Sequence, residues 1–336
     1  MNSKEQLFNK FFSHIYVEKE AYDYEIARNI LDKYKDARVV TIDHYKDVFN
    51  RSKQNYIMQN KSQKLILAKQ HDTHIYDGAA VCQNFGNDNF YYTSCVMNCI
   101  YDCEYCYLKG MYPSGNMVLF VNLEDTFSKI KEMLKEHSMY ICISYDTDLL
   151  AIESITGYVK RWIDFVEENE KLTIEIRTKS ANANIWETLK KSERVIYAFT
   201  LSPEQVVSKY EHNTQSLRAR IDSIVKAQQS GHIVRLCFDP MIYIPRWKEN
   251  YSRMLETVKA DIDLDKLWDV SVGSFRVSQE YLKKMRKNMP YSAVIQFPYQ
   301  NTKGVYHYPD LLLEEMEGYL NDMLRQLVSE DKIFRW

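Results

Sequence analysis

The sequence predicts an α/β fold in which about six β/α units form an open or closed barrel. From residue 89 onward, short apolar segments of strand type alternate with amphipathic segments of helical period. The connections between them are short, as parallel strands crossed by helices allow. An apolar content of 45% over 336 residues supports a large core. The loops at the carboxyl ends of the strands are therefore the expected site.

Residues 89–275 are expected to form this barrel. Its strands are predicted at residues 89–92, 140–144, 172–178, 195–201, 233–238 and 269–272. Its helices are predicted at residues 123–137, 152–168, 184–191, 216–230 and 247–258. Asn122 is suited to cap the first of these helices, and Gly231 is suited to end the fourth in a left-handed conformation.

Smaller units are expected on both sides of the barrel. Residues 1–88 form a small N-terminal α/β extension, with a strand at residues 15–17 and a helix at residues 21–34. Residues 276–336 form a C-terminal part. It is predicted to contain a basic helix at 279–288, a stretch with turns at 291–308 and a terminal helix at 311–330.

Charge and composition exclude several classes of protein. Lys+Arg 44 against Asp+Glu 46 gives a formal charge of −2, so no overall positive field draws the chain to nucleic acid or to an anionic membrane. No apolar run approaches the ~20 residues that cross a bilayer, and residues 1–12 lack a signal-peptide core. Seven cysteines, four of them between residues 95 and 106, make a poor disulfide framework. We therefore expect a cytoplasmic protein in a reducing compartment.

Three cysteines, Cys99, Cys103 and Cys106, stand in the spacing C-x₃-C-x₂-C within residues 91–108. Three thiolates this close in sequence can converge on one inorganic core. A [4Fe–4S] cluster normally takes four thiolates, so three cysteines leave one iron free for another ligand. The motif therefore predicts an open iron–sulfur site.

Zinc is the alternative for the same loop. A structural zinc site takes four ligands, usually from paired C-x₂-C units. The sequence has no second unit of that kind. Cys95, four residues upstream, could supply a fourth ligand, which keeps a zinc site or a closed cluster as interpretations.

Two segments carry one-sided positive charge. In residues 51–70 the basic residues, with no acidic residue among them, are Arg51, Lys53, Lys61, Lys64 and Lys69. In residues 276–291 the basic residues, against the single acid Glu280, are Arg276, Lys283, Lys284, Arg286 and Lys287. Such runs are typical of solvated surface, and they would also suit a phosphate backbone.

An α/β barrel whose first strand leads into C-x₃-C-x₂-C, with an aromatic residue before the last cysteine, resembles the radical S-adenosylmethionine superfamily. The resemblance implies a partial (β/α)₆ barrel and a [4Fe–4S] cluster held by Cys99, Cys103 and Cys106. It implies that the open iron binds S-adenosyl-L-methionine and that an external electron donor reduces the cluster. The products are then methionine and a 5′-deoxyadenosyl radical. The cofactor supplies the difficult chemistry, and the protein positions and shields it.

The chain further resembles the spore photoproduct lyase family over nearly its whole length. The segments that carry this resemblance begin at Ile15 (IYVEK), Cys103 (CEYCYL), Val121 (VNLE), Thr147 (TD), Thr178 (TK), Phe199 (FTL), Pro240 (PMIYI) and Gly273 (GSFR). All except the first fall at or near a predicted strand end, where a barrel places its site.

By this resemblance, four strand-end residues contact S-adenosylmethionine: Thr147, Asp148, Lys179 and Thr200. Lys179 is expected to pair with the methionyl carboxylate, and the hydroxyl groups of Thr147 and Thr200 are expected to hydrogen-bond its polar groups. Thr200 stands where the family pattern has serine, which keeps the hydroxyl.

The resemblance also implies a reaction, the reversal of a methylene-bridged thymine dimer in DNA. The adenosyl radical abstracts a hydrogen atom from the lesion, and a cysteine thiol then quenches the product radical. Two tyrosines help to return the radical to the cofactor, and Tyr105 and Tyr107 match that pair. The quenching cysteine itself falls on Tyr145, and the nearest thiol, Cys142, shares a strand face with Ser144 instead. Tyr145 is therefore the candidate hydrogen donor.

The C-terminal part departs from the family as well. Family members carry an Arg-Tyr hairpin, rich in glycine and basic residues, that wedges into damaged duplex DNA. Residues 293–308 are shorter, with only Lys303 and Gly304 of that character. If the protein binds DNA, we expect the two local basic segments to contact it.

Three functions follow from these observations. The first is a radical S-adenosylmethionine lyase that repairs thymine dimers in DNA, acting as a monomer. The second is a relative that kept the cofactor chemistry and acts on a free nucleotide or another small molecule. The third is a non-catalytic metal-binding nucleic-acid protein, which explains the cysteine loop but not the strand-end residues.

Overall fold

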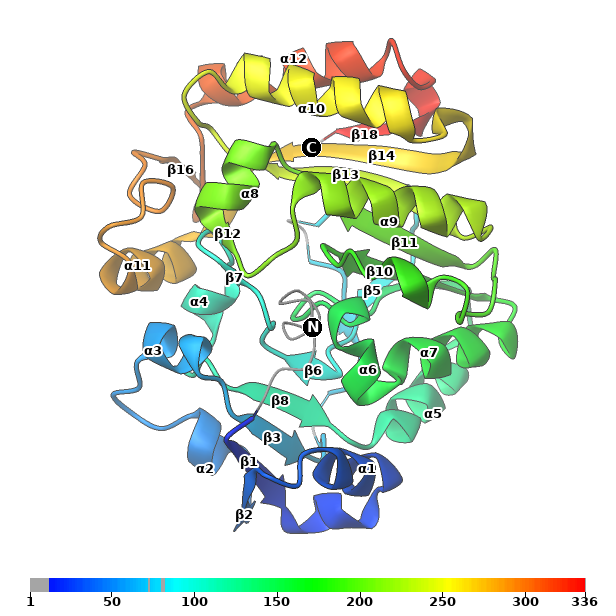
Figure 1. Ribbon diagram of the computed structural model, residues 1–336, viewed down its shortest axis with the longest axis vertical. Helices are drawn as coiled ribbons and strands as arrows, with labels where there is room; N and C mark the ends of the chain where they lie inside the picture. The colour runs from blue at the N-terminus through cyan, green and yellow to red at the C-terminus, as the bar shows by residue number, and fades with distance from the viewer. Residues whose placement is uncertain (1–11, 72, 80–81, 336) are drawn as a thin grey trace.

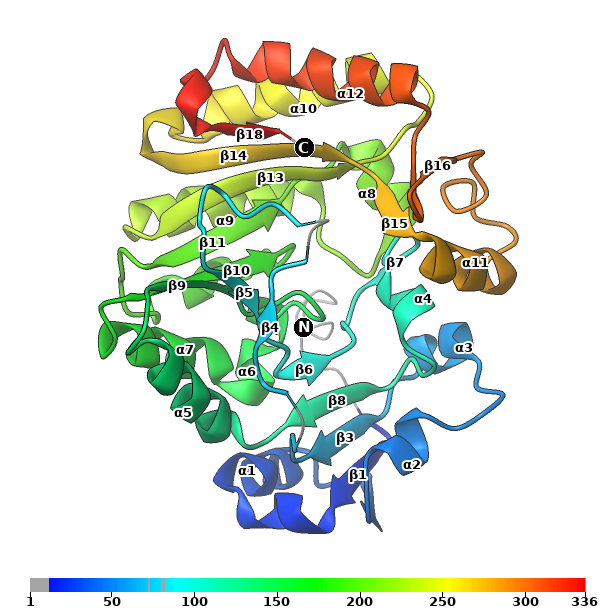
Figure 2. The ribbon, with the colours of Figure 1, turned by 180° about the vertical axis from the view of Figure 1, so that it is seen from behind.

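The computed structural model describes residues 12–71, 73–79 and 82–335. Its larger sheet curls into part of a barrel (Figures 1 and 2). In spatial order its strands are β18 (Ile333–Arg335), β14 (Leu267–Ser274), β13 (Ile233–Met241), β11 (Val195–Thr200), β10 (Leu172–Thr178), β9 (Met139–Cys142), β5 (Phe90–Tyr92) and β4 (Tyr76–Asp77). The strands from β5 to β14 run parallel and are the six that the sequence predicts. The partial barrel is confirmed.

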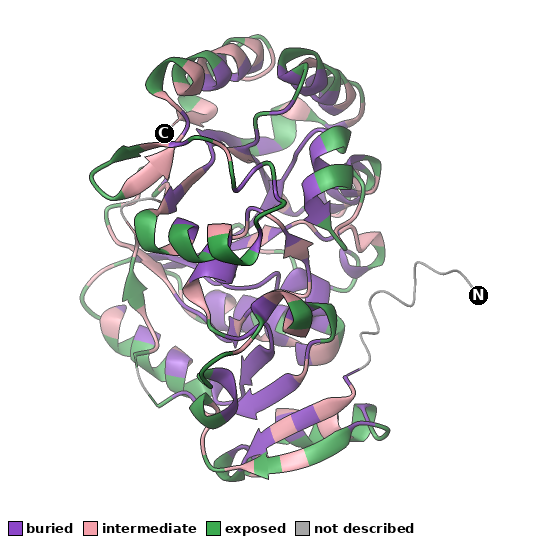
Figure 3. Ribbon diagram, turned by 90° about the vertical axis from the view of Figure 1, so that its left-hand side faces the viewer, coloured by how far each residue is buried: buried purple, intermediate pink, exposed green. Residues whose placement is uncertain are grey.

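Helices cover the outer face of this sheet (Figure 1). They are α5 (Leu123–Met133), α7 (Tyr158–Glu167), α9 (Leu217–Gln229), α10 (Trp247–Asp261) and α12 (Asp310–Leu324). In α7 the buried residues Val159, Trp162, Ile163 and Val166 recur on one helical face. Burying an apolar side chain of this size contributes about 1.5–3 kcal/mol. Figure 3 shows the same division between buried strands and exposed outer helix faces.

A second sheet joins the N-terminal extension to the cysteine loop. Its spatial order is β2 (Arg38–Ile42), β1 (His14–Glu18), β3 (Leu65–Ala68), β8 (Met117–Phe120) and β6 (Val96–Met97). A bridge between Ser94 and Ser144 connects it to the larger sheet. The predicted helix at 21–34 is a 3₁₀ turn, Lys19–Asp23, followed by α1 (Glu25–Lys33). The extension is thus hydrogen-bonded to strands on both sides of the cysteines.

Some local predictions are wrong. The helix expected at 184–191 is only a 3₁₀ turn, Ala183–Ile185. The buried Trp186 ring donates to Ser223 at 2.9 Å and its carbonyl accepts from His232 at 2.8 Å, which ties this segment to its neighbours. Asn122 does stand at the N-cap of α5, but its side chain accepts from the backbone N–H of Gln70 at 2.8 Å and makes no capping bond. No described helix has the length and apolar character that a membrane span requires.

The concave side of the larger sheet carries a buried ion-pair network. Arg235 bonds both Glu175 and Asp269, and its guanidinium lies 3.3 Å from the ring centre of Phe85. Burial raises the pKa of Glu175, but the charges of Arg177 and Arg235 outweigh it and lower that pKa from 4.5 to about 2. The stability from this carboxylate is therefore present above about pH 4.5 and is lost as the pH falls toward 2.

Replacing Arg235 by methionine is expected to lower the free energy of unfolding by about 3–5 kcal/mol, because Asp269 stays buried without its partner and Glu175 keeps only Arg177. Arg218→Met is the matched control. Arg218 also bonds two carboxylates, Asp222 and Asp261 at 2.6 Å each, but its side chain is 58% exposed, so the loss should stay below about 1 kcal/mol. Urea unfolding measures the free energy of unfolding of both variants. Equal losses would contradict a stabilising role of the buried ion-pair network.

The C-terminal part closes over the cysteine loop. Helix α11 (Gln279–Asn288) packs on α4 (Leu108–Met111), which follows the last cysteine directly. Beside α11 lies a small antiparallel sheet of β15 (Arg276–Ser278), β17 (Val305–His307) and β16 (Gln300–Thr302). Its hairpin turns at Lys303 and Gly304, both with positive φ, as a two-residue hairpin turn requires.

Gly110 in α4 sits where no side chain fits. A Cβ there would lie 2.5 Å from the carbonyl oxygen of Tyr281 in α11. We expect Gly110→Ala to destabilise the protein by about 1–3 kcal/mol, because α11 must move away. Gly318→Ala in α12 is the control, since the nearest atom would be Glu314 Oε1 at 3.9 Å, and it should stabilise by up to about 1 kcal/mol. Thermal unfolding should give shifts of opposite sign; shifts of the same sign would contradict the close packing.

Candidate active site

A cavity of about 490 Å³ is formed where the parallel strands end. The cysteine loop contributes Cys99, Tyr105 and Tyr107 to its wall together with Cys103 and Cys106. The strand ends contribute Tyr145, Thr147, Asp148, Lys179 and Thr200. The structure thus brings together all the site residues that the sequence singled out. Their individual roles remain predictions.

Contacts from distant segments hold the cysteine loop. Strand β7 (Asp102–Cys103) pairs with β12 (Glu211–His212), which places Glu211 opposite Cys103. The backbone N–H of Glu104 donates to the carbonyl of Tyr210 at 2.8 Å. The Gln63 side chain donates to the carbonyl of Cys99 at 2.9 Å. A loop fixed in this way presents its thiols without further ordering.

Burial dominates the surroundings of the three thiols. Burial raises the pKa of each of them, to about 12 for Cys103, so they are protonated at neutral pH unless iron binds. Within the described ranges, no three Cys, His, Asp or Glu side chains converge on one point where a single metal ion could sit. The three thiols line one cavity. Cys95 is 3% exposed and belongs to the hydrophobic core.

Thr147 and Thr200 offer hydroxyl groups to the cavity. The Oγ1 atom of Thr147 is buried and has no hydrogen-bond partner among the described residues. A buried hydroxyl without a partner costs free energy, which a polar ligand would recover. The carbonyl of Thr200 accepts from Arg220 at 3.2 Å. Thr147 therefore fits the role of a ligand contact, and Thr200 lies in the same cavity wall.

Asp148 is occupied within the protein. Its carboxylate accepts from the Thr178 hydroxyl at 2.9 Å, from Lys179 N–H at 2.7 Å and from Ala151 N–H at 3.0 Å. These bonds fix the turn that carries Lys179. The geometry thus gives Asp148 a positioning role beside the direct contact predicted from the resemblance.

Lys179 lies between the cysteine loop and a buried acid. Its Nζ atom is 3.0 Å from the Tyr105 hydroxyl, 3.7 Å from Glu211 Oε1 and 3.8 Å from Cys103 Sγ. The Tyr105 hydroxyl also donates to Glu211, which Arg220 pairs from the other side. Neither Glu211 nor Arg220 was expected, since both lie on a segment with no motif of its own.

Tyr107 and Tyr145 meet at the opposite wall. The Tyr107 hydroxyl lies 2.9 Å from the Tyr145 carbonyl and 3.0 Å from Asp146 Oδ1. Asp146 also accepts from Tyr112 at 2.8 Å and Ser94 at 2.7 Å. The backbone at Tyr145 is therefore anchored to the cysteine loop, while its ring stays in the cavity wall.

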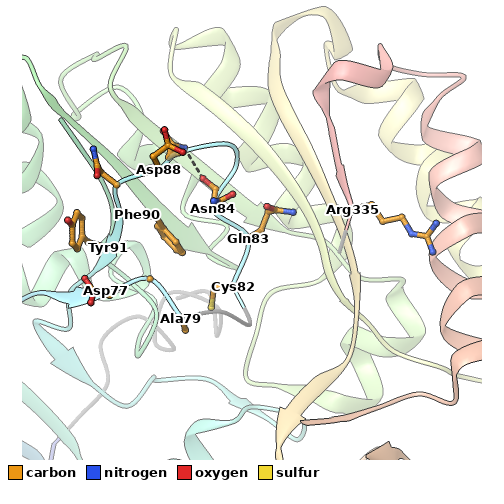
Figure 4. A pocket seen from close by; sticks show the side chains of 12 residues that line it. Asp77, Ala79, Cys82, Gln83, Asn84, Asp88, Phe90, Tyr91 and Arg335 are labelled. Carbon is orange, nitrogen blue, oxygen red and sulfur yellow. Dashed lines mark hydrogen bonds between the residues drawn. The ribbon is translucent and has the colours of Figure 1, made fainter. Parts of the chain in front are cut away.

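Cys82 is the residue that the sequence analysis missed. It lines the same cavity as Tyr145. Burial raises the pKa of the Cys82 thiol, and the nearby Tyr145 hydroxyl opposes that rise. Cys82 and Ala79 also line a second cavity of about 560 Å³ on the same loop (Figure 4). In the sequence Cys82 stands alone, without a motif or periodic pattern.

Cys142 does not take the place of Cys82 as a thiol in the cavity wall. Its thiol is fully buried, lies 3.7 Å from Glu175 Oε1 and is not part of the cavity wall. This agrees with the alternation of side chains along a strand. Outside the cysteine loop, Cys82 is thus the cysteine among the described residues that lines the cavity together with Tyr145, the position where the resemblance led us to expect a thiol.

The two basic segments differ in their placement. In residues 51–70, Lys69 pairs with Glu20 at 3.0 Å and Lys64 bonds Ser13, at either end of the buried strand β3. That segment is therefore not one continuous phosphate-facing surface. In α11, the exposed basic residues are Lys283, Lys284 and Lys287. Arg276 lines the cavity and bonds Asp239 at 3.2 Å.

Sequence comparison relates the chain to one family. The family model of spore photoproduct lyase matches residues 11–304. Spore photoproduct lyase of Clostridium acetobutylicum is 24% identical over 289 residues, 83% of this chain and 83% of that protein. Spore photoproduct lyase of Bacillus subtilis is 22% identical over 297 residues, 86% of this chain and 82% of that protein.

Solved structures share the fold. A variant of spore photoproduct lyase aligns with a TM-score of 0.82 at 16% identity, covering 97% of this chain and 99% of the other. Another variant, solved with bound AdoMet and dinucleoside spore photoproduct, aligns with a TM-score of 0.81 at 17% identity and the same coverage. Because the family model spans most of the sequence, the chain belongs to the spore photoproduct lyase family.

Proposed function

We propose that this protein is a radical S-adenosylmethionine lyase that reverses a methylene-bridged thymine lesion in DNA. The observation that carries the proposal is the single cavity that the three loop cysteines share with the strand-end residues and with Cys82. Membership of the family supports it. The relative solved with AdoMet and dinucleoside spore photoproduct supports the same pair of ligands.

The cavity residues divide into a cofactor side and a substrate side. A [4Fe–4S] cluster with S-adenosyl-L-methionine supplies a hydrogen-abstracting 5′-deoxyadenosyl radical when an external donor reduces it. Cys99, Cys103 and Cys106 would hold that cluster. Lys179 would pair with the methionyl carboxylate, and Thr147 would bond a polar group through its unpartnered hydroxyl.

On the substrate side, Cys82 would give the hydrogen atom that ends the repair. The radical left on the product takes hydrogen from the thiol, so that the S–H bond of Cys82 breaks and a C–H bond forms. Tyr145, predicted from sequence as the donor, lines the same cavity as Cys82 and would hold the thiol in place. This assignment restores a thiol donor in a chain that has tyrosine at the family position.

DNA would reach the cavity along α11. Tyr281 of this helix lines the cavity, and Lys283, Lys284 and Lys287 are exposed on it. Lysines in such a row can contact successive phosphates. A lesion inside a duplex must be turned out of the stack to reach a cavity, which costs a few kcal/mol and less for damaged bases. The basic helix beside the cavity would help to offset that cost.

Anaerobic reconstitution tests the function. We expect about four irons per chain and, with dithionite and S-adenosylmethionine, formation of 5′-deoxyadenosine. With a synthetic dinucleoside spore photoproduct, thymine dinucleoside should be released. An undamaged dinucleoside is the control and should remain unchanged. Cofactor cleavage with an intact lesion would instead favour another substrate, such as a free nucleotide, and zinc binding without 5′-deoxyadenosine would contradict an enzyme of this type.

A further inference from the structure

A row of alternating charges runs along the concave side of the larger sheet and ends in the cavity wall. Its buried end is the network in which Arg235 bonds Asp269 and Glu175. The Nε atom of Arg177 donates to Glu175 at 2.8 Å, and its Nη1 atom lies 3.7 Å from Asp239 Oδ2. Glu175 and Arg177 are two residues apart in β10 and therefore point to the same face of the sheet.

Two guanidinium groups share the Asp239 carboxylate at the cavity end of this row. Arg276 donates from Nη1 and from Nη2 to the two carboxylate oxygens, at 3.2 Å each. Arg177 lies beside one of these oxygens. Asp239 and both arginines line the cavity, whereas the three members at the buried end do not. A carboxylate has about four lone-pair sites, so Asp239 can accept a further hydrogen bond from a ligand.

The row is electrically neutral, because each of its three arginines is balanced by a carboxylate. Its field therefore does not attract a phosphate in the way that a row of lysines does. Its cavity end presents an acceptor, the Asp239 carboxylate, together with the N–H donors of Arg177 and Arg276. The complementary ligand is a neutral group with acceptor, donor and acceptor along one edge.

The imide edge of thymine has this order, because its N3–H lies between the carbonyl oxygens O4 and O2. Cytosine presents an amino group, an acceptor nitrogen and a carbonyl oxygen along the same edge, so its pattern does not match. Enzymes that act on an extruded base recognise it through this edge. The methylene bridge of the lesion joins the rings at other atoms, and both rings therefore keep their N3–H.

The cavity end of the row lies on the substrate side. Burial raises the pKa of the Cys82 thiol, whereas the charges of Arg177 and Arg276 lower it and that of Asp239 raises it. These charges are therefore close to the thiol that is proposed to give its hydrogen atom to the substrate. A thymine ring held by them would lie next to that thiol.

We propose that Asp239, with Arg177 and Arg276 beside it, recognises the imide edge of one thymine ring of the lesion. Asp239 accepts the hydrogen bond from N3–H, and the two guanidinium groups donate to O2 and O4. This inference rests on the proposed function and deepens it, because it assigns the residues that select thymine over cytosine. The buried end of the row fixes these side chains, so they need no ordering when the ring enters.

A lesion methylated at N3 tests the proposal. The methyl group removes the donor and occupies its place. We would prepare two dinucleoside lesions, each methylated on one of the two rings, and measure their dissociation constants for the reconstituted wild-type protein. Methylation of the recognised ring should weaken binding roughly 10- to 100-fold. Equal affinity for the unmodified lesion and for both methylated lesions would overturn the proposal.

Asp239→Ala assigns this loss of affinity to one residue. The variant lacks the acceptor and has room for the methyl group, so the methylated and unmodified lesions should bind it with nearly equal affinity. Asp269→Ala is the matched control, because Asp269 is also bonded to an arginine of the row but does not line the cavity. It should keep the wild-type difference. An undiminished difference in Asp239→Ala would show that another residue recognises N3–H.

A second experiment needs neither the cluster nor the lesion. Saturation-transfer NMR compares the binding of thymidine, N3-methylthymidine and deoxycytidine to the purified protein. The wild type should prefer thymidine. Asp239→Asn, which keeps the side-chain shape and can donate to cytosine N3, should lose much of this preference, and Asp269→Asn should keep it. Equal signals from the three nucleosides, or none from thymidine, would overturn the proposal.

The two experiments also separate this inference from the proposed function. A wild-type protein that prefers thymidine through Asp239 but leaves the lesion intact would contradict lesion repair and would still support recognition of the imide edge. A protein that repairs the lesion and binds the methylated lesions equally well would support the function and overturn the inference.

Discussion

Replacing Cys103 by alanine is expected to abolish the cluster and all formation of 5′-deoxyadenosine. Its thiol lies in the cavity wall 3.8 Å from Lys179 Nζ, in strand β7, which is paired to β12. Cys99→Ala and Cys106→Ala should have the same effect, because two thiolates cannot replace three at an open cluster. Iron content and the visible absorption of the reconstituted protein measure the loss.

Cys95→Ala is the matched control for these variants. Cys95 belongs to the same stretch of sequence but is 3% exposed and packed in the core, so it should keep its iron and its activity. The Cys95→Ala substitution should lose only packing contacts in the core. Loss of iron in Cys95→Ala at unchanged unfolding temperature would mean that four thiols hold the metal, and the open-cluster assignment would be wrong.

Cys82→Ser is expected to separate cofactor cleavage from repair. The formation of 5′-deoxyadenosine should continue, because Cys82 is not among the loop cysteines. Thymine release should fall sharply, and the unquenched product radical should appear as adducts, since serine holds its hydrogen too strongly to donate it. Chromatography of the dinucleoside products measures the shift.

Two further variants make this result specific. Cys142→Ser removes a thiol that is buried beside Glu175 and does not line the cavity, so its products should match those of the wild type. Adding Tyr145→Cys to Cys82→Ser moves a thiol to the neighbouring wall and should restore part of the thymine release. Normal products from Cys82→Ser alone would place the hydrogen donor elsewhere, with Tyr145 the next candidate.

Much of the fold could be read from local sequence. The six parallel strands are short apolar segments bounded by polar turns, and each was found near its predicted position. Gly231 has the left-handed conformation predicted for it, with φ of +79°. The helix at 184–191 could not be excluded locally, because what prevents it is the contact of Trp186 with Ser223 and His232, far along the chain.

In the candidate site too, some residues could be placed from local sequence and others depend on long-range contacts. Strand-end residues such as Thr147 and Lys179 could be placed together because parallel strands end on one side. Cys82 could not, because it lies in an irregular segment whose path depends on the contact between Phe85 and Arg235. Glu211 depends in the same way on β12 reaching β7. Residues placed by long-range contacts carry no local signal.

The pairing of β7 with β12 also sets an order of assembly. The cysteine loop is bonded to a segment made much later, since Glu104 contacts His212 across 108 residues. At a synthesis rate of about 5–20 residues per second, this gap lasts roughly 5–20 seconds. During that interval the loop emerges from the ribosome without its covering strand. The loop can therefore take its paired conformation only after β12 has been made.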